Sequence, residues 1–468
     1  MRRTKIIATI GPATSSEERL AELIEAGLDV ARLNASHSGA DELAIRLATI
    51  RRIAEKAGRH VAVLLDLAGP KVRVGEVAEG TELLAGERFV LLGRKCAGDS
   101  SQAGITYTGL AADVSAGDRI LIDDGKIELV VESTAGADVH TTVVTGGPLT
   151  SHKGVNVPYV SLGVEPITDY DREILAWGLS AGVDYVAQSF VRRPEDVTEL
   201  RALMGERPVP IVTKVEKHEA MEHIDAIIAQ SDAVMVARGD LGVETSPEQV
   251  PVYQRKIISA CRGSATPVIV ATQMLESMIT APKPTRAEAS DVANAIFSRA
   301  DAVMLSAETA IGAWPVRSVE TMARIAVTAE ESMGPASRKP LGRSAEGSIT
   351  EAVSAAVREL AEDLGVVAIV TATQSGATAR TIAGHRPSAP IVAATPYPHV
   401  ARRLALVRGV MPVVLPLADA TAEMLAAIDE MLLAAGLAAV GDRVAVTAGI
   451  ASRRSGATDF VVVRTIGG

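Results

Sequence analysis

The sequence predicts an α/β protein built on a (β/α)8 TIM barrel, with a small β domain inserted into the barrel and a separate C-terminal α/β domain. Short apolar runs alternate with capped amphipathic stretches, and this alternation stops between Gly69 and about Tyr159. A linker rich in Ser, Gly, Arg and Lys from about Pro335 then precedes further alternating elements. The expected segments are 1–68 and 164–335 for the barrel, 69–163 for the insertion and 336–468 for the C-terminal domain.

The first elements read as two strand–helix units followed by a third strand. A helix is predicted after Ser15-Ser16-Glu17-Glu18, a capping-box pattern, and it ends at Gly27. The next helix is predicted over residues 41–57, with Gly58 as its stop. The three strands are predicted at Lys5–Ile10, Leu28–Leu33 and Val61–Leu65.

The insertion follows this third strand. Gly, Asp, Thr and Val dominate it, its apolar runs are short, and turn signals such as Asp123-Asp124-Gly125 recur. This pattern is typical of a small β domain.

The strand–helix alternation resumes after the insertion. Helix starts are indicated by Thr168-x-x-Asp171, by Ser246-Pro247-Glu248-Gln249 and by Thr285-Arg286-Ala287-Glu288. Three strands before the insertion and five after it make the eight of a closed barrel. The five are Val183–Ala187, Pro210–Val215, Ala233–Val236, Val268–Ala271 and Ala302–Leu305. The C-terminal domain has predicted strands at Val366–Val370, Ile391–Ala394, Val410–Leu415, Val444–Thr447 and Phe460–Val463.

Composition excludes several classes of function. The 468 residues include 47 Lys and Arg against 57 Asp and Glu, a net charge of −10 that disfavours nucleic acid or an anionic membrane as the main partner. Cys96 and Cys261 are far apart in the sequence, which excludes a disulfide scaffold and fits a reducing cytoplasm. The sequence has no signal-peptide pattern and no uncharged apolar run long enough to span a membrane, so a cytoplasmic protein is expected.

Polar residues gather at the carboxyl ends of the predicted barrel strands, where active sites of this fold lie. Loop polarity alone would give scattered Ser, Asn and Gly, not Arg, Lys, Glu and Asp gathered at one end. The strand-end segments are Thr9–Pro12, Arg32–His37, Asp66–Arg73, Gln188–Phe190, Lys214–Glu216, Arg238–Asp240, Thr272-Gln273 and Ser306–Glu308.

Glu216 and Asp240 end neighbouring strands, and a pair of carboxylates with water is a usual Mg²⁺ site. Salt bridges to Lys214 and Arg238 are the alternative role for these carboxylates. Lys214 lies two residues before Glu216, so both side chains face the same way on a strand. A cation beside a metal-bound anion suits stabilisation of a transferring phosphoryl group or an enolate.

Further residues of the strand-end segments, and motifs near them, also bear on the chemistry. Arg32 and Arg73 come from different segments and could grip a phosphate. His218 and His223 are five residues apart, which is the wrong spacing for the metalloprotease helix motif. No Walker-type phosphate loop is present, so a nucleotide would be held in another way.

These motifs resemble those of the pyruvate kinase family along nearly the whole chain. They are Thr9–Pro12, Arg32–His37, Lys214–Glu216, Met235–Gly242, Ala271–Met278, Pro284–Glu288 and Asp301–Ser306, in the order in which the family has them. The resemblance implies a barrel, a mobile β-barrel lid made from the insertion, and a C-terminal domain that binds effectors and helps to form a homotetramer. It also implies phosphoryl transfer from phosphoenolpyruvate to ADP.

The resemblance also implies roles for individual residues. Glu216 and Asp240 match the ligands of Mg²⁺ or Mn²⁺, Lys214 matches the group that stabilises the transfer, and Thr272 is a candidate proton relay. The positions that match substrate contacts are Arg32, Gly239, Asp240 and Thr272, and those that match nucleotide contacts are Asn34, Ala35, Ser36, His37, Arg73 and Lys153.

The potassium site of the family matches Asn34, Ser36, Asp66 and the carbonyl of Leu67. Members that need potassium usually carry Thr at the position of Leu67 and Glu at the position of Lys71. The chain therefore resembles the potassium-independent branch, in which a lysine supplies the charge. The alternative is that Lys71 only extends to solvent.

A candidate effector site follows the predicted strand Val366–Val370. Backbone N–H groups and hydroxyls at a helix N-terminus can bind an anion, and the residues here are Thr373, Ser375, Gly376 and Thr378. The alternative is a plain helix cap. The resemblance points to a phosphorylated effector such as a sugar phosphate or AMP.

Two other functions would use part of the same constellation. A Mg²⁺-dependent aldolase acting on pyruvate enolate needs a similar carboxylate pair, but neither the lid with Lys153 nor the paired arginines. A non-catalytic metabolite sensor would be expected to have lost Lys214, Glu216 or Asp240, and all three are present.

Overall fold

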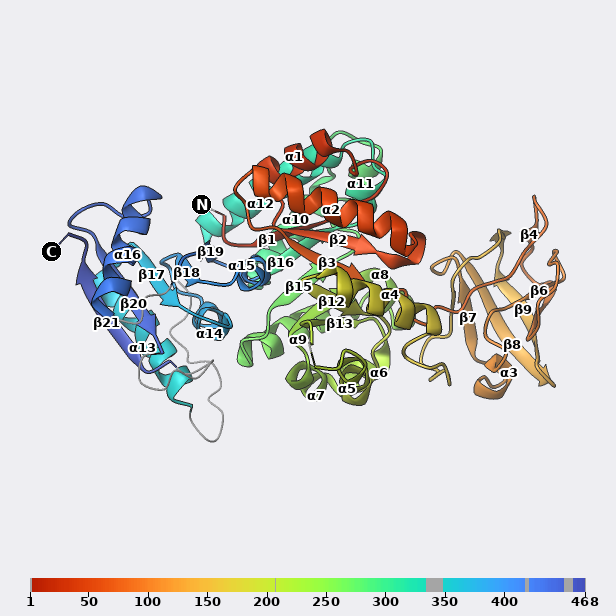
Figure 1. Cartoon of the computed structure of the whole chain (residues 1–468). Coiled ribbons are helices and arrows are strands. Elements are labelled where there is room, and N and C mark those ends of the chain that lie inside the picture. Colours follow the sequence, from red (N-terminus) through yellow and green to blue (C-terminus); the bar gives the residue numbers. More distant parts are fainter. Residues whose placement is uncertain (1, 207, 334–347, 417–420, 450–457, 468) are drawn as a thin grey trace.

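The computed structural model describes residues 2–206, 208–333, 348–416, 421–449 and 458–467. Three bodies lie in a row, with the barrel in the middle, the inserted β segment on one side and the C-terminal domain on the other (Figure 1). The predicted boundary at residue 335 and the linker that starts there fall outside the described residues. The boundaries at 68 and 163 stay predictions.

Eight parallel strands close the barrel in the order β1-β16-β15-β14-β13-β12-β3-β2. Each of the eight lies within two residues of its predicted position, because a strand buried on both faces reads as a continuous apolar run. The strands are β1 (Lys5–Thr9), β2 (Val30–Asn34), β3 (Ala62–Asp66), β12 (Tyr185–Gln188), β13 (Ile211–Val215), β14 (Ala233–Ala237), β15 (Val268–Ala271) and β16 (Ala302–Leu305).

Helices surround the barrel and bury their apolar faces on it. Thr168 and Thr285 begin their helices with complete capping boxes, as predicted. Ser16 caps its helix through Arg19 N, without a reciprocal bond. The helices are α1 (Glu17–Ala26), α2 (Ala40–Lys56), α4 (Asp169–Ala181), α5 (Pro194–Leu203), α6 (His218–Glu222), α7 (Ile224–Gln230), α8 (Arg238–Glu244), α9 (Val250–Gly263), α10 (Arg286–Phe297), α11 (Ala307–Ala310) and α12 (Pro315–Ser332).

The prediction of a capping box at Ser246–Gln249 is wrong. These residues form a turn, and α9 begins after it at Val250 with Pro251 in its first turn. Gln249 makes no side-chain capping bond. A proline suits the first turn of a helix wherever that turn starts, so the pattern marked a nearby helix but not its first residue.

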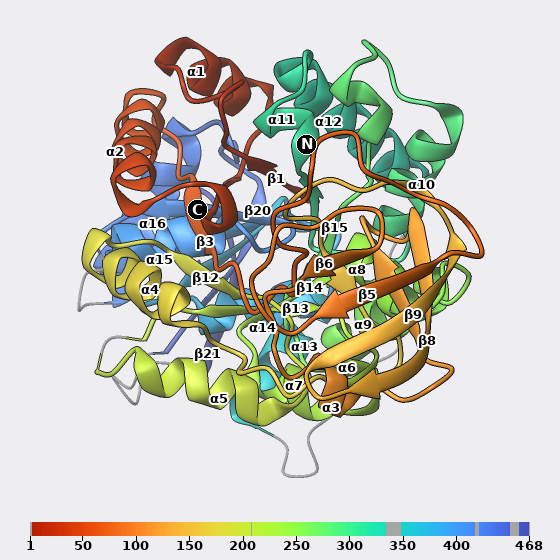
Figure 2. The same ribbon diagram turned by 90° about the vertical axis from the view of Figure 1, so that its right-hand side faces the viewer.

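The insertion, called the lid below, folds as a six-stranded sheet in the order β11-β7-β8-β9-β5-β6 and a two-stranded sheet of β10 and β4. Isolated bridges from Arg73 to Gly154 and from Val74 to Ile105 link the two edges of the larger sheet. The elements are β4 (Glu82–Leu83), β5 (Arg88–Leu92), β6 (Gln102–Gly104), α3 (Leu110–Asp113), β7 (Arg119–Ile122), β8 (Ile127–Ala135), β9 (Asp138–Thr145), β10 (Gly147–Pro148) and β11 (Val155–Asn156). In Figure 2 the lid lies in front of the barrel.

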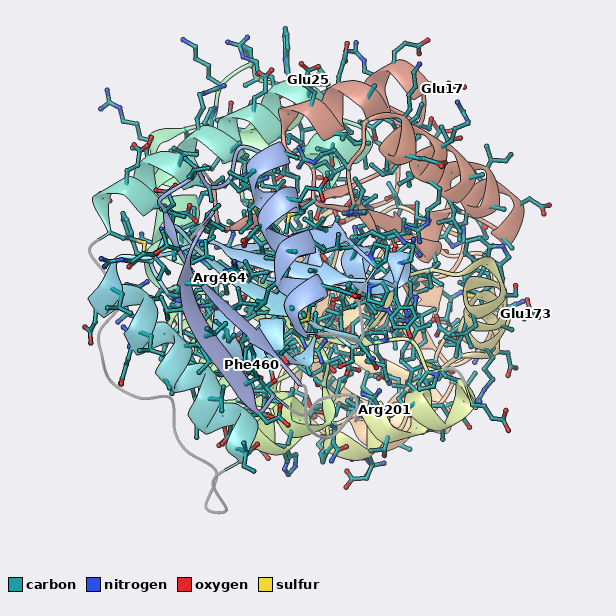
Figure 3. The ribbon with its side chains drawn as sticks, turned by 60° about the vertical axis from the view of Figure 1, so that its left-hand side comes forward. Glu17, Glu25, Glu173, Arg201, Phe460 and Arg464 are labelled. Atoms are coloured by element: carbon teal, nitrogen blue, oxygen red, sulfur yellow. The ribbon has the colours of Figure 1, made fainter. Side chains whose placement is uncertain are left out.

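The C-terminal domain holds a five-stranded sheet in the order β19-β18-β17-β20-β21, with only β21 antiparallel to its neighbour. Figure 3 shows β21 at the front of this domain, where Phe460 and Arg464 are labelled. The elements are α13 (Ile349–Leu364), β17 (Ala368–Ala372), α14 (Ala377–Gly384), β18 (Ile391–Thr395), α15 (Pro398–Leu404), β19 (Val410–Val414), α16 (Thr421–Ala434), β20 (Arg443–Ala448) and β21 (Phe460–Thr465).

This domain packs on the amino ends of the barrel strands. Ala405 and Leu406 join the apolar cluster inside the barrel, and Arg386 makes two hydrogen bonds to Asp301 just before β16. The carboxyl ends of the strands therefore face the lid and carry the candidate site. In the part of the chain described, no helix combines the length and apolar character that crossing a bilayer requires.

Candidate active site

Asp66 lies at the centre of the polar residues that follow the barrel strands. It ends β3, is 1% exposed, and accepts a hydrogen bond of 2.7 Å from Arg32 Nε at the end of β2. Its other oxygen lies 3.4 Å from Lys214 Nζ. Burial alone would raise the pKa of Asp66, but Lys214 and Arg32 outweigh it and hold this pKa below its ordinary value. Asp66 is thus an ionised anchor for two cations.

Lys214 on β13 is held between two carboxylates. Its Nζ lies 2.9 Å from Glu216 Oε1 and donates a hydrogen bond of 2.7 Å to Ser189 Oγ. Burial would lower the pKa of Lys214, but Asp66 and Glu216 outweigh it and raise the pKa above its ordinary value. The ammonium is therefore a fixed positive charge in a place from which water is largely excluded.

Glu216 and Asp240 form the candidate divalent-metal site. Burial, together with the nearby Asp240 carboxylate, raises the pKa of Glu216 in spite of Lys214. A buried carboxylate whose ionisation is opposed by burial and by a second anion suits a cation that neutralises the pair. Within the described ranges no group of three or more His, Cys, Asp or Glu side chains is arranged to hold a metal. Mg²⁺ is commonly held by one or two carboxylates, with substrate oxygens and water as its other ligands.

Asp240 has a direct cationic partner of its own. Lys71 Nζ, from the chain that leaves the barrel for the lid, lies 3.1 Å from Asp240 Oδ1. The alternative that Lys71 only extends to solvent is therefore wrong. Of the alternative salt bridges, the one between Lys214 and Glu216 is present at 2.9 Å. In the described contacts Arg238 binds Asp291 at 2.6 Å and not Asp240.

Thr272 follows β15 with a backbone φ of 65°, a value that β-branched residues rarely adopt. Arg238 Nη2 donates to the Thr272 carbonyl at 2.7 Å, and the Thr272 hydroxyl accepts from Gly239 N at 2.8 Å and donates to Ala271 O at 2.7 Å. Gln273 and Phe190 also have positive φ values at strand ends. Such strained backbone concentrates at functional sites.

A cleft of about 850 Å³ lies between the lid and the mouth of the barrel. Its walls include Asp124 and Tyr159 on the lid side and Gly239, Gly242 and Gln273 on the barrel side. This volume falls in the range of sites for small molecules. The cleft reaches the Gly239 end of the candidate site.

The residues proposed to contact a nucleotide are spread over two bodies. Arg73 and Lys153 lie on the lid, where Arg73 Nη1 donates to His152 O at 3.0 Å and Lys153 Nζ pairs with Asp123 at 2.9 Å. Arg32 instead binds Thr9 and Asp66 at the barrel mouth, so the described contacts do not join the two arginines.

The stretch from Asn34 to His37 ends β2 in a short 3-10 turn. Asn34 Oδ1 accepts a hydrogen bond from Ser36 N at 3.2 Å, Ala35 is buried, and Ser36 is exposed. The side chain of His37 lies outside the described part of the structure. The Leu67 carbonyl accepts a bond of 2.8 Å from Ser189 Oγ.

The candidate effector residues lie far from the barrel mouth. Gly376 has a φ of 79°, and its N–H donates to Thr373 Oγ1 at 2.9 Å. The Thr378 hydroxyl is buried against that of Thr458 at 2.5 Å, while Ser375 is exposed at the start of α14. Among these side chains, Ser375 is thus the most accessible to a ligand.

Sequence reasoning gave no role to two groups that shape the site. Ser189 joins Lys214 to the Leu67 carbonyl, and the backbone N–H of Phe190 donates to Glu216 Oε2 at 2.7 Å. Both belong to a strand-end segment that the sequence singles out, so their position was the available signal. The residue types, a serine and a phenylalanine, give no indication of a role in the site.

Comparison with known proteins gives whole-chain similarity. Residues 1–319 match the family model described as "Pyruvate kinase, barrel domain", and residues 351–464 match "Pyruvate kinase, alpha/beta domain". "Pyruvate kinase 2" of Synechocystis sp. is 45% identical over 474 residues, which cover 99% of this chain and 79% of that protein. "Pyruvate kinase" of Geobacillus stearothermophilus is 44% identical over 475 residues, which cover 99% of this chain and 80% of that protein. "Pyruvate kinase" of Mycobacterium tuberculosis (strain ATCC 25618 / H37Rv) is 43% identical over 472 residues, which cover 100% of this chain and 99% of that protein.

Proposed function

The chain belongs to the pyruvate kinase family and is a phosphotransferase, and we propose that it transfers the phosphoryl group of phosphoenolpyruvate to ADP with Mg²⁺ or Mn²⁺. The observation that carries the proposal is the fixed charge of Lys214, held within 2.9 Å of Glu216 and 3.4 Å of Asp66. Phosphoryl transfer requires mainly positioning and neutralisation of oxygen charge, which this arrangement supplies.

In the proposed site, Glu216 and Asp240 would hold the divalent cation, which supplies charge neutralisation at the phosphoryl oxygens. Lys214 stabilises charge that develops during transfer, and Arg32 together with the N–H of Gly239 binds the substrate phosphate. Arg73, Lys153 and the stretch from Asn34 to His37 bind the nucleotide. These assignments extend the family motifs to this chain residue by residue.

Protonation of the enolate follows the transfer, and we assign its relay to Thr272. The hydroxyl of Thr272 donates to Ala271 O and accepts from Gly239 N, so it lies beside the proposed phosphate contact. To deliver a proton to the enolate carbon it must turn away from Ala271 O and, as it gives up this proton, take another from water in the cleft. The positive φ of Thr272 is a strained backbone conformation, and such strain persists where the surrounding structure holds a residue in one position.

We further propose that potassium is not required, because Lys71 brings a permanent cation to Asp240. Two of the four positions that match the family's potassium site have other partners, since Asp66 pairs with Arg32 and the Leu67 carbonyl accepts from Ser189. For regulation, we propose a homotetramer, in the cytoplasm, that binds a phosphorylated small molecule at Thr373, Ser375, Gly376 and Thr378.

The test is an assay with purified protein, phosphoenolpyruvate, ADP and Mg²⁺, in which lactate dehydrogenase and NADH report pyruvate. We expect pyruvate and ATP in equal amounts, no reaction after chelation of the divalent cation, and near loss of activity in Glu216→Gln. An aldolase would instead consume pyruvate with an aldehyde, and a sensor would bind ligands without turnover. Either result with active-site residues intact would overturn the proposed reaction.

A further inference from the structure

Both chain connections between the barrel and the lid run past one small cavity. The outgoing chain contributes Pro70 and Lys71, and the returning chain contributes Val155 and Asn156. The cavity has a volume of about 20 Å³, and Glu244 at the end of α8 lines its barrel side. The root of the lid therefore meets the barrel at a site with a buried carboxylate.

Glu244 joins three parts of the molecule through one oxygen. Its Oε1 accepts a hydrogen bond of 2.6 Å from Asn156 Nδ2 of the lid and lies 2.8 Å from Lys217 Nζ. Lys217 directly follows Glu216, and α8 begins with Arg238, Gly239 and Asp240. A single contact thus joins the lid, through Asn156, to two barrel elements. One is Lys217, which follows the proposed metal ligand Glu216, and the other is α8, which carries the proposed ligand Asp240.

This contact is costly to bury. Glu244 is 0% exposed, and its second oxygen and the Asn156 amide oxygen have no hydrogen-bond partner within the described ranges. A buried ion pair with unsatisfied acceptors adds little net stability over apolar residues of the same size. Its benefit is geometric, because a charged acceptor fixes its donors more narrowly than apolar packing does.

We propose that Glu244 is a positioning residue that sets how the lid stands on the barrel: Asn156 of the lid and Lys217 of the barrel both contact the same carboxylate oxygen. The proposal rests on the proposed phosphoryl transfer only for its kinetic consequence. Arg73 and Lys153 on the lid reach the nucleotide, whereas the contacts proposed for phosphoenolpyruvate come from the barrel. Loosening the lid root should therefore weaken ADP binding selectively.

The first variant is Asn156→Leu, which keeps the size of the side chain and removes its bond to Glu244. We expect KM for ADP to rise about tenfold, the scale of losing one hydrogen bond to a charged group, with KM for phosphoenolpyruvate changed less than twofold. Asn156→Asp should be more harmful, because it places a second carboxylate beside Glu244.

The double variant Asn156→Asp, Glu244→Gln exchanges donor and acceptor and leaves one carboxylate for Lys217. We expect it to bring KM for ADP back to within about threefold of the native value, the range left by imperfect geometry. A purely structural role for Glu244 would give no such rescue. Ser151→Ala is the matched control, because the side chain of Ser151 exchanges hydrogen bonds with the backbone of Val77, which also belongs to the lid.

Hydrogen exchange read by mass spectrometry tests the same idea without turnover. We expect faster exchange over residues 70–74 and 155–164 in Asn156→Leu, and native exchange there in Ser151→Ala and in the double variant. Unchanged exchange, or equal rises of KM for both substrates, would overturn the role of Glu244. A native protein that makes no pyruvate would refute the proposed function instead, and the exchange experiment would still decide the role of Glu244.

Discussion

Lys214 on β13 and Glu216, the residue that follows this strand, form an ion pair of 2.9 Å, with 12% of the lysine side chain and 1% of the glutamate side chain exposed. Side chains two residues apart on a strand face the same way, so the strand itself fixes their separation. Asp66 ends β3, which β12 separates from β13, and its carboxylate lies 3.4 Å from the ammonium. The cation is therefore in position before a substrate binds.

The first prediction concerns this ammonium. Because charge develops on the phosphoryl oxygens mainly in the transition state, Lys214→Ala should lower kcat by ~10²-fold or more while leaving KM for phosphoenolpyruvate nearly unchanged. Steady-state kinetics with both substrates varied would measure this split. Lys283→Ala, at an exposed lysine, is the control. Near-native turnover of Lys214→Ala would remove the assigned role.

The second prediction concerns pH and stability at Glu288. Its carboxylate accepts from Ser277 N at 2.7 Å, Ser277 Oγ at 2.5 Å, Thr285 N at 2.7 Å and Thr285 Oγ1 at 3.0 Å. Burial would raise the pKa of Glu288, but these donors outweigh it and hold the pKa below its ordinary value of 4.5. The ionised form therefore stabilises the fold above pH 4.5, and this contribution is lost as the pH falls through the lower folded-state pKa.

Glu288→Gln keeps the shape of the side chain and removes the charge. We expect it to lower Tm at pH 7, with a loss of about 1 kcal/mol for a weakened cap, and the difference from the native protein should shrink below pH 4.5. Thermal unfolding at pH 7, 5 and 4 would follow it. A difference in Tm that stayed the same at all three pH values would contradict the assignment.

The third prediction concerns the C-terminal domain. Ser375 is exposed beside Gly376 at the start of α14, so a carboxylate there would repel a phosphate. Ser375→Asp should abolish activation by AMP and by sugar phosphates and leave the unactivated rate near native, while the neutral Ser375→Asn should keep part of the response. Thr378→Asp should abolish activation too, but it buries a charge against Thr458, so its unfolding must be measured alongside. Full activation of both carboxylate variants would place the effector elsewhere.

The barrel was predictable because local patterns and tertiary packing agree there. Val268–Ala271 is a fully buried apolar run, and both of its ends match the prediction. Thr168 and Thr285 mark helix starts because their capping bonds are made within four residues.

The details of the site depended on contacts that no short pattern contains. Lys71 and Asp240 are 169 residues apart in the chain, and only the closed barrel with its lid brings them together. The positive φ of Thr272 runs against the preference of a β-branched residue and is accompanied by the bond from Arg238 to its carbonyl. Ser189 has no motif of its own, although it links Lys214 to Leu67.

The last prediction concerns potassium, and it depends on where Lys71 delivers its charge. The pair with Asp240 places an ammonium at the proposed metal end of the site, so the anionic pocket is already partly neutralised without an ion from solution. In potassium-free buffer with tetramethylammonium as the cation, native activity should stay within about threefold of that with potassium. Lys71→Glu adds a negative charge where the positive one stood, so it should make activity dependent on potassium. Lys71→Met, which only removes the charge, should show a smaller dependence, and this gradation separates a charge effect from simple damage to the lid root.

Gly154→Ala offers a second probe, because a Cβ there would stand 2.8 Å from Lys71 Cε and displace the side chain without changing any charge. It should give partial potassium dependence if the position of the ammonium is what matters. A native enzyme that is inert without potassium would refute the proposal, since a lysine that truly replaces the ion cannot leave the site waiting for one.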